Sequence, residues 1–171
     1  MSGRLPADWR AETGRVLSRW GDPPWGRAVA EDKQKGRFRD ELVEAAADML
    51  RERWRPAPWP AWVACVPSRK RPRLVPDYAA RLARALDLPF EETVVKLRDN
   101  EEQKAQHNSY RQCRNLDGVF AIEGTVRPGP VLLVDDVADS GWTLTVISVL
   151  LRRAGSGPVW PLALASASMA G

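Results

Sequence analysis

The sequence contains little cysteine and histidine, which argues against most metal centres and disulfide frameworks. Its 171 residues include two cysteines, Cys65 and Cys113, and one histidine, His107. They form neither a CxxC pair nor a Cys/His cluster, so we expect two reduced thiols and no zinc site. A lone histidine in a polar stretch is more often a surface residue than a catalytic one, so we assign His107 no role.

The sequence also lacks a long apolar run. No stretch reaches the roughly 18 apolar residues of a membrane-spanning helix, and the polar start at residues 1–9 does not resemble a signal peptide. We therefore expect a cytoplasmic protein that makes no membrane contact. The formal net charge of +4 permits a phosphate-rich ligand or nucleic acid but requires neither.

The spacing of apolar residues predicts a single α/β domain with a mainly parallel sheet flanked by helices. The domain is expected at residues 37–171, after an N-terminal extension at 1–36 that shows no clean period. Helices are expected at 37–54, 74–87 and 142–154, and strands at 62–66, 93–95, 119–122, 131–134 and 159–164. The last strand is expected at a sheet edge because it contains Pro161.

The strongest functional pattern lies at residues 131–143. Four apolar residues run into the adjacent acids Asp135 and Asp136. A turn then opens the next helix, and it consists of Asp139, Ser140, Gly141, Trp142 and Thr143. Free backbone N–H groups and the positive end of a helix dipole favour phosphate there, whereas carboxylates suit sugar hydroxyls or Mg²⁺. The pattern predicts a sugar-phosphate site; the alternative is an ordinary strand, turn and capped helix.

This segment resembles the fingerprint with which type I phosphoribosyltransferases bind 5-phosphoribosyl 1-diphosphate (PRPP). Only Ala138 is smaller than the family's usual aliphatic residue. The resemblance implies a type I phosphoribosyltransferase-like fold and substrate binding by residues 135, 136 and 139–143. It implies that Asp135 and Asp136 hold the ribose hydroxyls and Mg²⁺. It further implies catalytic roles for Asp136 and Asp139, the latter as general acid or base.

A basic stretch follows the first expected strand. In the family, the loop at this place meets the diphosphate of PRPP. The resemblance therefore implies substrate binding by Ser68, Arg69 and Lys70, with Arg71 beside them. Basic groups there would offset the charge of the leaving group. A solvated basic turn is the alternative.

Two more specific resemblances involve other parts of the chain. The polar segment 96–118 is expected to be a mobile loop, and residues 103–120 are similar to the flexible hood of the competence-related ComF group. The order of several short motifs is most similar to the phosphoribosyltransferase-like domain at the C-terminal end of some bacterial RecQ-family DNA helicases. Those motifs are Gly36-Arg37-Phe38, Trp62 to Ser68, Leu74-Val75-Pro76-Asp77, Leu88-Pro89-Phe90 and Asp139 to Leu144. Neither a G-x-x-x-x-G-K-[ST] loop nor a helicase acidic box is present, so this chain is not a motor. The ComF zinc finger is missing as well.

Three functions therefore remain open. The first is Mg²⁺-dependent transfer of phosphoribose from PRPP to a nitrogenous base. The second is a non-catalytic module that senses PRPP or a nucleotide. The third is a nucleic-acid accessory domain, in which basic residues and tryptophans contact the strand. PRPP or a nucleotide is the expected partner, with a DNA helicase, nucleic acid or a second copy of the chain as open alternatives.

Overall fold

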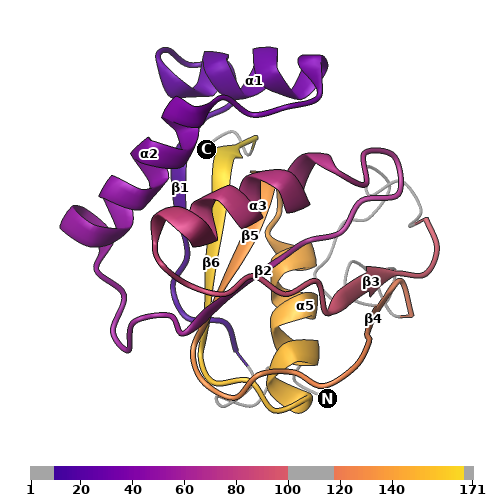
Figure 1. Ribbon diagram of the computed structural model, residues 1–171. Helices are drawn as coiled ribbons and strands as arrows, with labels where there is room; N and C mark the ends of the chain where they lie inside the picture. The colour runs from indigo at the N-terminus through magenta and orange to yellow at the C-terminus, as the bar shows by residue number, and fades with distance from the viewer. Residues whose placement is uncertain (1–9, 100–117, 168–171) are drawn as a thin grey trace.

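A computed structural model describes residues 10–99 and 118–167 (Figure 1). Its centre is a four-stranded parallel sheet in the order β1-β6-β5-β2. These strands are β1 (Arg15–Arg19), β2 (Trp62–Cys65), β5 (Val131–Ala138) and β6 (Val159–Ser166). A separate antiparallel pair consists of β3 (Val94–Lys96) and β4 (Phe120–Ile122). The helices are α1 (Trp25–Lys35), α2 (Asp40–Asp48) with its π-helical continuation η2 (Met49–Trp54), α3 (Leu74–Ala85) and α5 (Trp142–Arg153).

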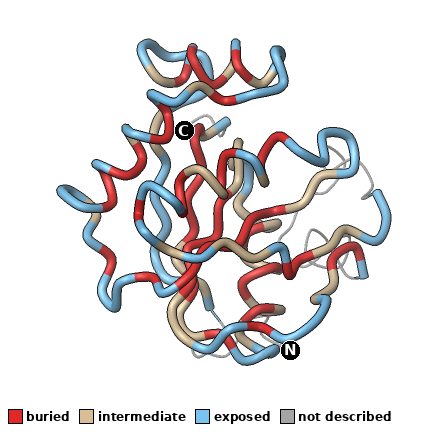
Figure 2. The backbone as a smooth tube through the Cα atoms, viewed as in Figure 1, coloured by how far each residue is buried: buried red, intermediate tan, exposed pale blue. Residues whose placement is uncertain are grey.

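Helices cover both faces of the parallel sheet (Figures 1 and 2). Alternate strand residues such as Val63 and Leu132 pack against α1, α2 and α3. The residues between them, such as Trp62 and Leu133, pack against α5 and the β3–β4 pair. Burial on both faces explains why these strands read as continuous apolar runs. The predicted architecture, a mainly parallel sheet flanked by helices, is confirmed.

The N-terminal region differs from the expectation of irregular structure. Residues 15–19 form β1, which pairs in parallel with β6, and residues 25–35 form α1. Consequently β6 lies inside the sheet, and the prediction that Pro161 marks an edge strand is wrong. Pro161 is tolerated because β1 begins at Arg15, opposite Leu162, so the proline lies just outside the β1 ladder.

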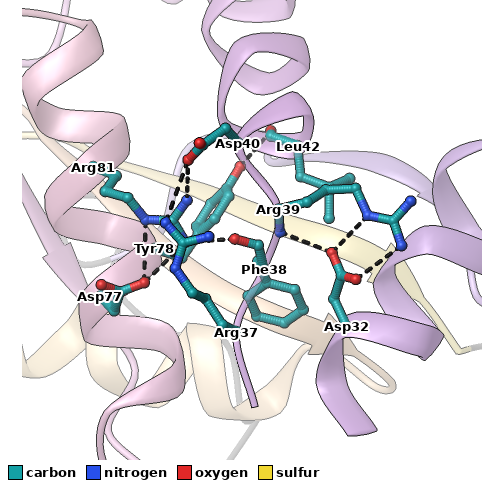
Figure 3. A network of polar contacts seen from close by, with 9 residues as sticks. All are labelled: Asp32, Arg37, Phe38, Arg39, Asp40, Leu42, Asp77, Tyr78 and Arg81. Carbon is teal, nitrogen blue, oxygen red and sulfur yellow. Dashed lines mark hydrogen bonds and ion pairs between the residues drawn. The ribbon is translucent and has the colours of Figure 1, made fainter. Parts of the chain in front are cut away.

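A polar network ties α1 to the helices that follow it (Figure 3). The carboxylate of Asp32 accepts hydrogen bonds from the backbone N–H, Nε and Nη2 of Arg39, each at 2.8 Å. Arg81 of α3 donates to the Phe38 carbonyl at 2.6 Å, and the Tyr78 hydroxyl donates to the Leu42 carbonyl at 2.8 Å. These bonds fix the C-terminal end of α1 to the start of α2, and α2 in turn to α3.

Two further observations complete the fold. No helix among residues 10–99 and 118–167 combines the length and the apolar character needed to cross a membrane. Cys65 is a buried free thiol, whereas Cys113 and His107 lie outside the described residues.

Candidate functional site

Strand β5 carries the acid pair beyond the end of its neighbour. β2 ends at Cys65, opposite Val134, whereas β5 continues to Ala138. Residues 135–138 remain paired with β6, but on the β2 side no strand of the described residues pairs with them. Because ligands of open α/β sheets bind at the carboxyl ends of strands, this step in the sheet is the natural place for a site.

A hollow of about 180 Å³ opens at this step, and we call it the acid hollow. Asp135 and Asp136 form one wall, and the basic turn after β2 forms another. Its lining residues are Lys33, Val66, Ser68, Lys70, Arg71, Leu74, Val75, Asp135 and Asp136. Cations and carboxylates therefore face the same small space, as a charged ligand that also bears hydroxyl groups would require.

Lys33 of α1 is a site residue that the sequence did not indicate. Its Nζ lies 2.9 Å from Oδ2 of Asp136, and the Asp136 side chain is only 15% exposed. The other carboxylate oxygen, Oδ1, accepts the backbone N–H of Val137 at 2.7 Å. Lys33 lies about a hundred residues from the acid pair, in a region that showed no periodicity, so no sequence signal joined them.

The turn that opens α5 forms a second hollow of about 90 Å³, which we call the loop hollow. Its lining residues are Asp135, Val137, Ala138, Asp139, Ser140, Gly141, Thr143 and Leu144. Gly141 has φ 80°, a left-handed conformation that favours glycine, and the Ser140 hydroxyl accepts the Trp142 N–H at 3.4 Å. The next amides of the first turn have no partner inside the helix, which suits them to a phosphate.

Asp135 lines both hollows, and its environment disfavours a negative charge. Burial and the adjacent Asp136 carboxylate raise the pKa of Asp135 well above its ordinary value. The backbone N–H of Asp136, which donates to Asp135 Oδ1 at 2.8 Å, and the charge of Lys33 offset this only in part. An added cation or hydroxyl donor would therefore relieve the acid pair.

The structure gathers most of the expected site residues but not all. Ser68 and Lys70 reach the acid hollow, and the Ser68 hydroxyl accepts the N–H of Arg71 at 3.2 Å. Arg69 instead donates to the Leu97 carbonyl at 3.3 Å and does not line the hollow. Trp142 packs partly against the core on the α5 side of the sheet rather than lining the loop hollow.

Two other expectations concern the rim of the site. Asp139 lines the loop hollow and is exposed to solvent. The hood expected at 103–120 lies mostly outside the described residues, which stop at 99 and resume at 118.

The acid pair offers donors suited to Mg²⁺. Carboxylate oxygens are ligands that this ion prefers, and it is commonly held by one or two carboxylates together with substrate phosphates. Within residues 10–99 and 118–167, no group of three or more potential ligating side chains gathers. Asp135 and Asp136 could bind Mg²⁺ together with a phosphorylated ligand. In the structure, Lys33 pairs with Asp136.

No protein-family model matches this chain, and no curated protein matches it significantly. Among solved structures, the purine phosphoribosyltransferase of Pyrococcus horikoshii Ot3 is 25% identical, with a TM-score of 0.47 over 74% of this chain and 72% of that chain.

Two adenine phosphoribosyltransferases are also similar. The one from Leishmania tarentolae is 18% identical, with a TM-score of 0.47 over 81% of this chain and 74% of its own. The one from Leishmania donovani is 17% identical, with a TM-score of 0.48 over 81% of this chain and 68% of its own. Likeness at these TM-scores carries no argument about what this chain binds, so its function must be argued from the site.

Proposed function

We propose that this chain is a type I phosphoribosyltransferase-like protein that binds PRPP or a ribose 5-phosphate nucleotide. The observation that carries the proposal is the placement of Asp135. This residue joins a hollow lined by cations and carboxylates to a hollow lined by the turn that opens a helix. A sugar with hydroxyl groups between two phosphate-bearing ends matches that order of chemical groups.

Each part of the ligand then has a proposed partner. The 5-phosphate takes the loop hollow, where it meets first-turn amides of α5 and the side chains of Ser140 and Thr143. The ribose hydroxyls donate to the carboxylates of Asp135 and Asp136. The diphosphate lies toward Ser68 and the basic residues of the acid hollow, which are Lys33, Lys70 and Arg71. We propose only a peripheral role for Arg69.

We propose that a nitrogenous base attacks the anomeric carbon and that diphosphate leaves toward the basic turn. Asp139 would take the proton from the attacking nitrogen, and Asp136 would hold the ribose in the reactive orientation. Bound Mg²⁺ would supply positive charge to the departing diphosphate. The rest of the catalysis is positioning and charge stabilisation by the chain's own residues.

Replacement of Asp136 tests the proposal. We expect Asp136→Asn to weaken PRPP binding about 100-fold, because hydrogen bonds to charged groups contribute about 1.5–3 kcal/mol each. Calorimetry with Mg²⁺ present measures the affinity of the variant and of the wild type. Asp48→Asn is the matched control, since Asp48 is exposed at the end of α2 and lines neither hollow. Unchanged affinity in Asp136→Asn would remove the basis for the proposal.

A non-catalytic PRPP- or nucleotide-sensing role is the second candidate, and the surroundings of Asp139 favour it. This residue is exposed, and within the described part of the chain no hydrogen bond orients its carboxylate. Under this alternative, the module is related to the tail of a RecQ-type helicase and serves a DNA helicase, nucleic acid or a second copy of the chain. A screen for diphosphate release over several nucleobases separates the two. Turnover indicates the enzyme, whereas tight PRPP binding without turnover indicates the sensor.

A further inference from the structure

We propose that Lys33 is a built-in cation at Asp136 that can stand in for Mg²⁺. In the absence of metal its ammonium group neutralises this carboxylate and lets the site bind a phosphorylated sugar. The two cations would therefore compete for the same carboxylate. The choice of a phosphorylated sugar as the ligand rests on the proposed function. The contact between Lys33 and Asp136, from which the inference is drawn, does not depend on that function.

The contact between Lys33 and Asp136 is closer and more enclosed than an ordinary surface ion pair. The two atoms lie 2.9 Å apart, and the side chains are 31% and 15% exposed. Both residues line the acid hollow, so the lysine ammonium lies where a phosphorylated ligand would bind. Water screens such a half-buried pair less than it screens charges on an open surface.

The backbone that carries Lys33 is fixed by the neighbouring residue. Asp32 is only 3% exposed and accepts three hydrogen bonds from Arg39 (Figure 3). The Asp32 carbonyl also accepts the N–H of Gly36 at 2.9 Å, at the point where α1 ends. Lys33 therefore projects from a rigid helix end, and its reach to Asp136 is built into the packing of α1.

Lys33 also supplies one of the three positive charges that line the acid hollow. Three cationic side chains, Lys33, Lys70 and Arg71, face two carboxylates, Asp135 and Asp136. Removal of Lys33 would lower the net charge of these groups by one and leave the Asp136 carboxylate without the cation that pairs with it. Without Lys33, the Asp136 carboxylate would repel a phosphate bound beside it, and an external cation would be needed to offset that repulsion.

The experiment compares Lys33→Met, which keeps an apolar stem, with Lys33→Arg and with the control Lys35→Met. Lys35 belongs to the same helix, is exposed and does not line the hollow. One arm measures Mn²⁺ binding by electron paramagnetic resonance with no other ligand present. The other arm measures ribose 5-phosphate binding by calorimetry in EDTA.

The affinities for Mn²⁺ and for ribose 5-phosphate should change in opposite directions. In Lys33→Met, Mn²⁺ should bind about 3- to 10-fold more tightly because its competitor is gone, and ribose 5-phosphate in EDTA should bind about 10-fold more weakly. Added Mg²⁺ should restore most of the sugar-phosphate affinity. Lys33→Arg and Lys35→Met should resemble the wild type in both arms. Loss of structure alone would weaken both ligands together.

Unchanged Mn²⁺ affinity in Lys33→Met, or a shift of both ligands in the same direction, would overturn the role of Lys33. If the wild type binds no ribose 5-phosphate in either condition, the proposed function fails, and the Mn²⁺ arm still decides the competition. Should Lys33→Met not fold, as thermal melting would show, Lys33→Gln replaces it in both arms.

Discussion

Asp32 and Asp135 are two shielded aspartates whose surroundings treat negative charge in opposite ways. Burial alone would raise the pKa of Asp32, but the hydrogen bonds and charge of Arg39, with the charge of Lys35, bring it below its ordinary value. For Asp135, burial and the neighbouring Asp136 carboxylate raise the pKa, and Lys33 lowers it only in part. The first carboxylate is satisfied by its own chain, and the second is not.

The contrast separates a region that holds the fold together from a region that is ready for a ligand. The network around Asp32 joins α1 to α2 and is complete within the protein (Figure 3). The acid pair at the end of β5 leaves charge uncompensated beside an open hollow. Strongly shifted acids in a cleft are typical of functional sites, because binding or chemistry repays the cost in stability.

Asp32→Asn should have the largest effect on stability. The amide would present a donor to the Arg39 guanidinium and lose charge-assisted hydrogen bonds, so we expect the melting temperature to fall by about 5 °C. Glu31→Gln is the matched control, because Glu31 contacts the same guanidinium at 3.1 Å with a side chain that is 50% exposed. An equal fall in both variants would show that the site of Asp32 has no special role.

Asp135→Asn should act in the opposite direction on stability while weakening the ligand. The pKa of Asp135 is raised above 3.8, so between pH 3.8 and the raised pKa the folded state holds a proton that the unfolded state has lost. The stability of the folded state therefore declines as pH rises through this range. Asparagine removes that decline. We expect a melting temperature about 2 °C higher near pH 7.5 and no gain near pH 3.5, together with weaker ribose 5-phosphate binding. A gain of the same size at both pH values would contradict the assignment.

The loss of folding stability at acidic pH is the smallest of the expected effects. Because the pKa of Asp32 is lowered from 3.8, its contribution is present above that value and is lost as pH falls through the lowered pKa. Between about pH 5 and pH 3 the wild type should lose slightly more stability than Asp32→Asn. Urea unfolding at the two pH values measures the difference, and parallel losses would mean that other groups control the loss of stability at acidic pH.

The loop hollow could be predicted from the sequence because it is local. Most of its lining belongs to residues 137–144, and one strand, one turn and one helix start position them. Apolar periodicity likewise indicated α3, α5 and the buried strands, since each pattern lies within its own element. A pattern that lies within one structural element can therefore be recognised from a single sequence.

The acid hollow could be predicted only in part because distant segments assemble it. The acid pair and the basic turn follow two strands that proved to be neighbours, so their meeting was foreseeable. Lys33 lies on α1, whose position depends on tertiary contacts with β1, β6 and α2. Strand β1 was missed for a similar reason: its five residues gain their structure by pairing with β6, with no strong pattern of their own.

The pairing of β1 with β6 has a consequence for how the chain folds. The Ser18 hydroxyl donates to the Leu164 carbonyl across 146 residues of sequence, so β1 cannot pair until β6, which lies far later in the chain, has been synthesised. Such distant pairing delays completion of the sheet, since a long loop must close before the contact stabilises anything. Until β1 docks, β6 presents an open edge to other chains, and aggregation of the half-finished protein becomes the competing outcome.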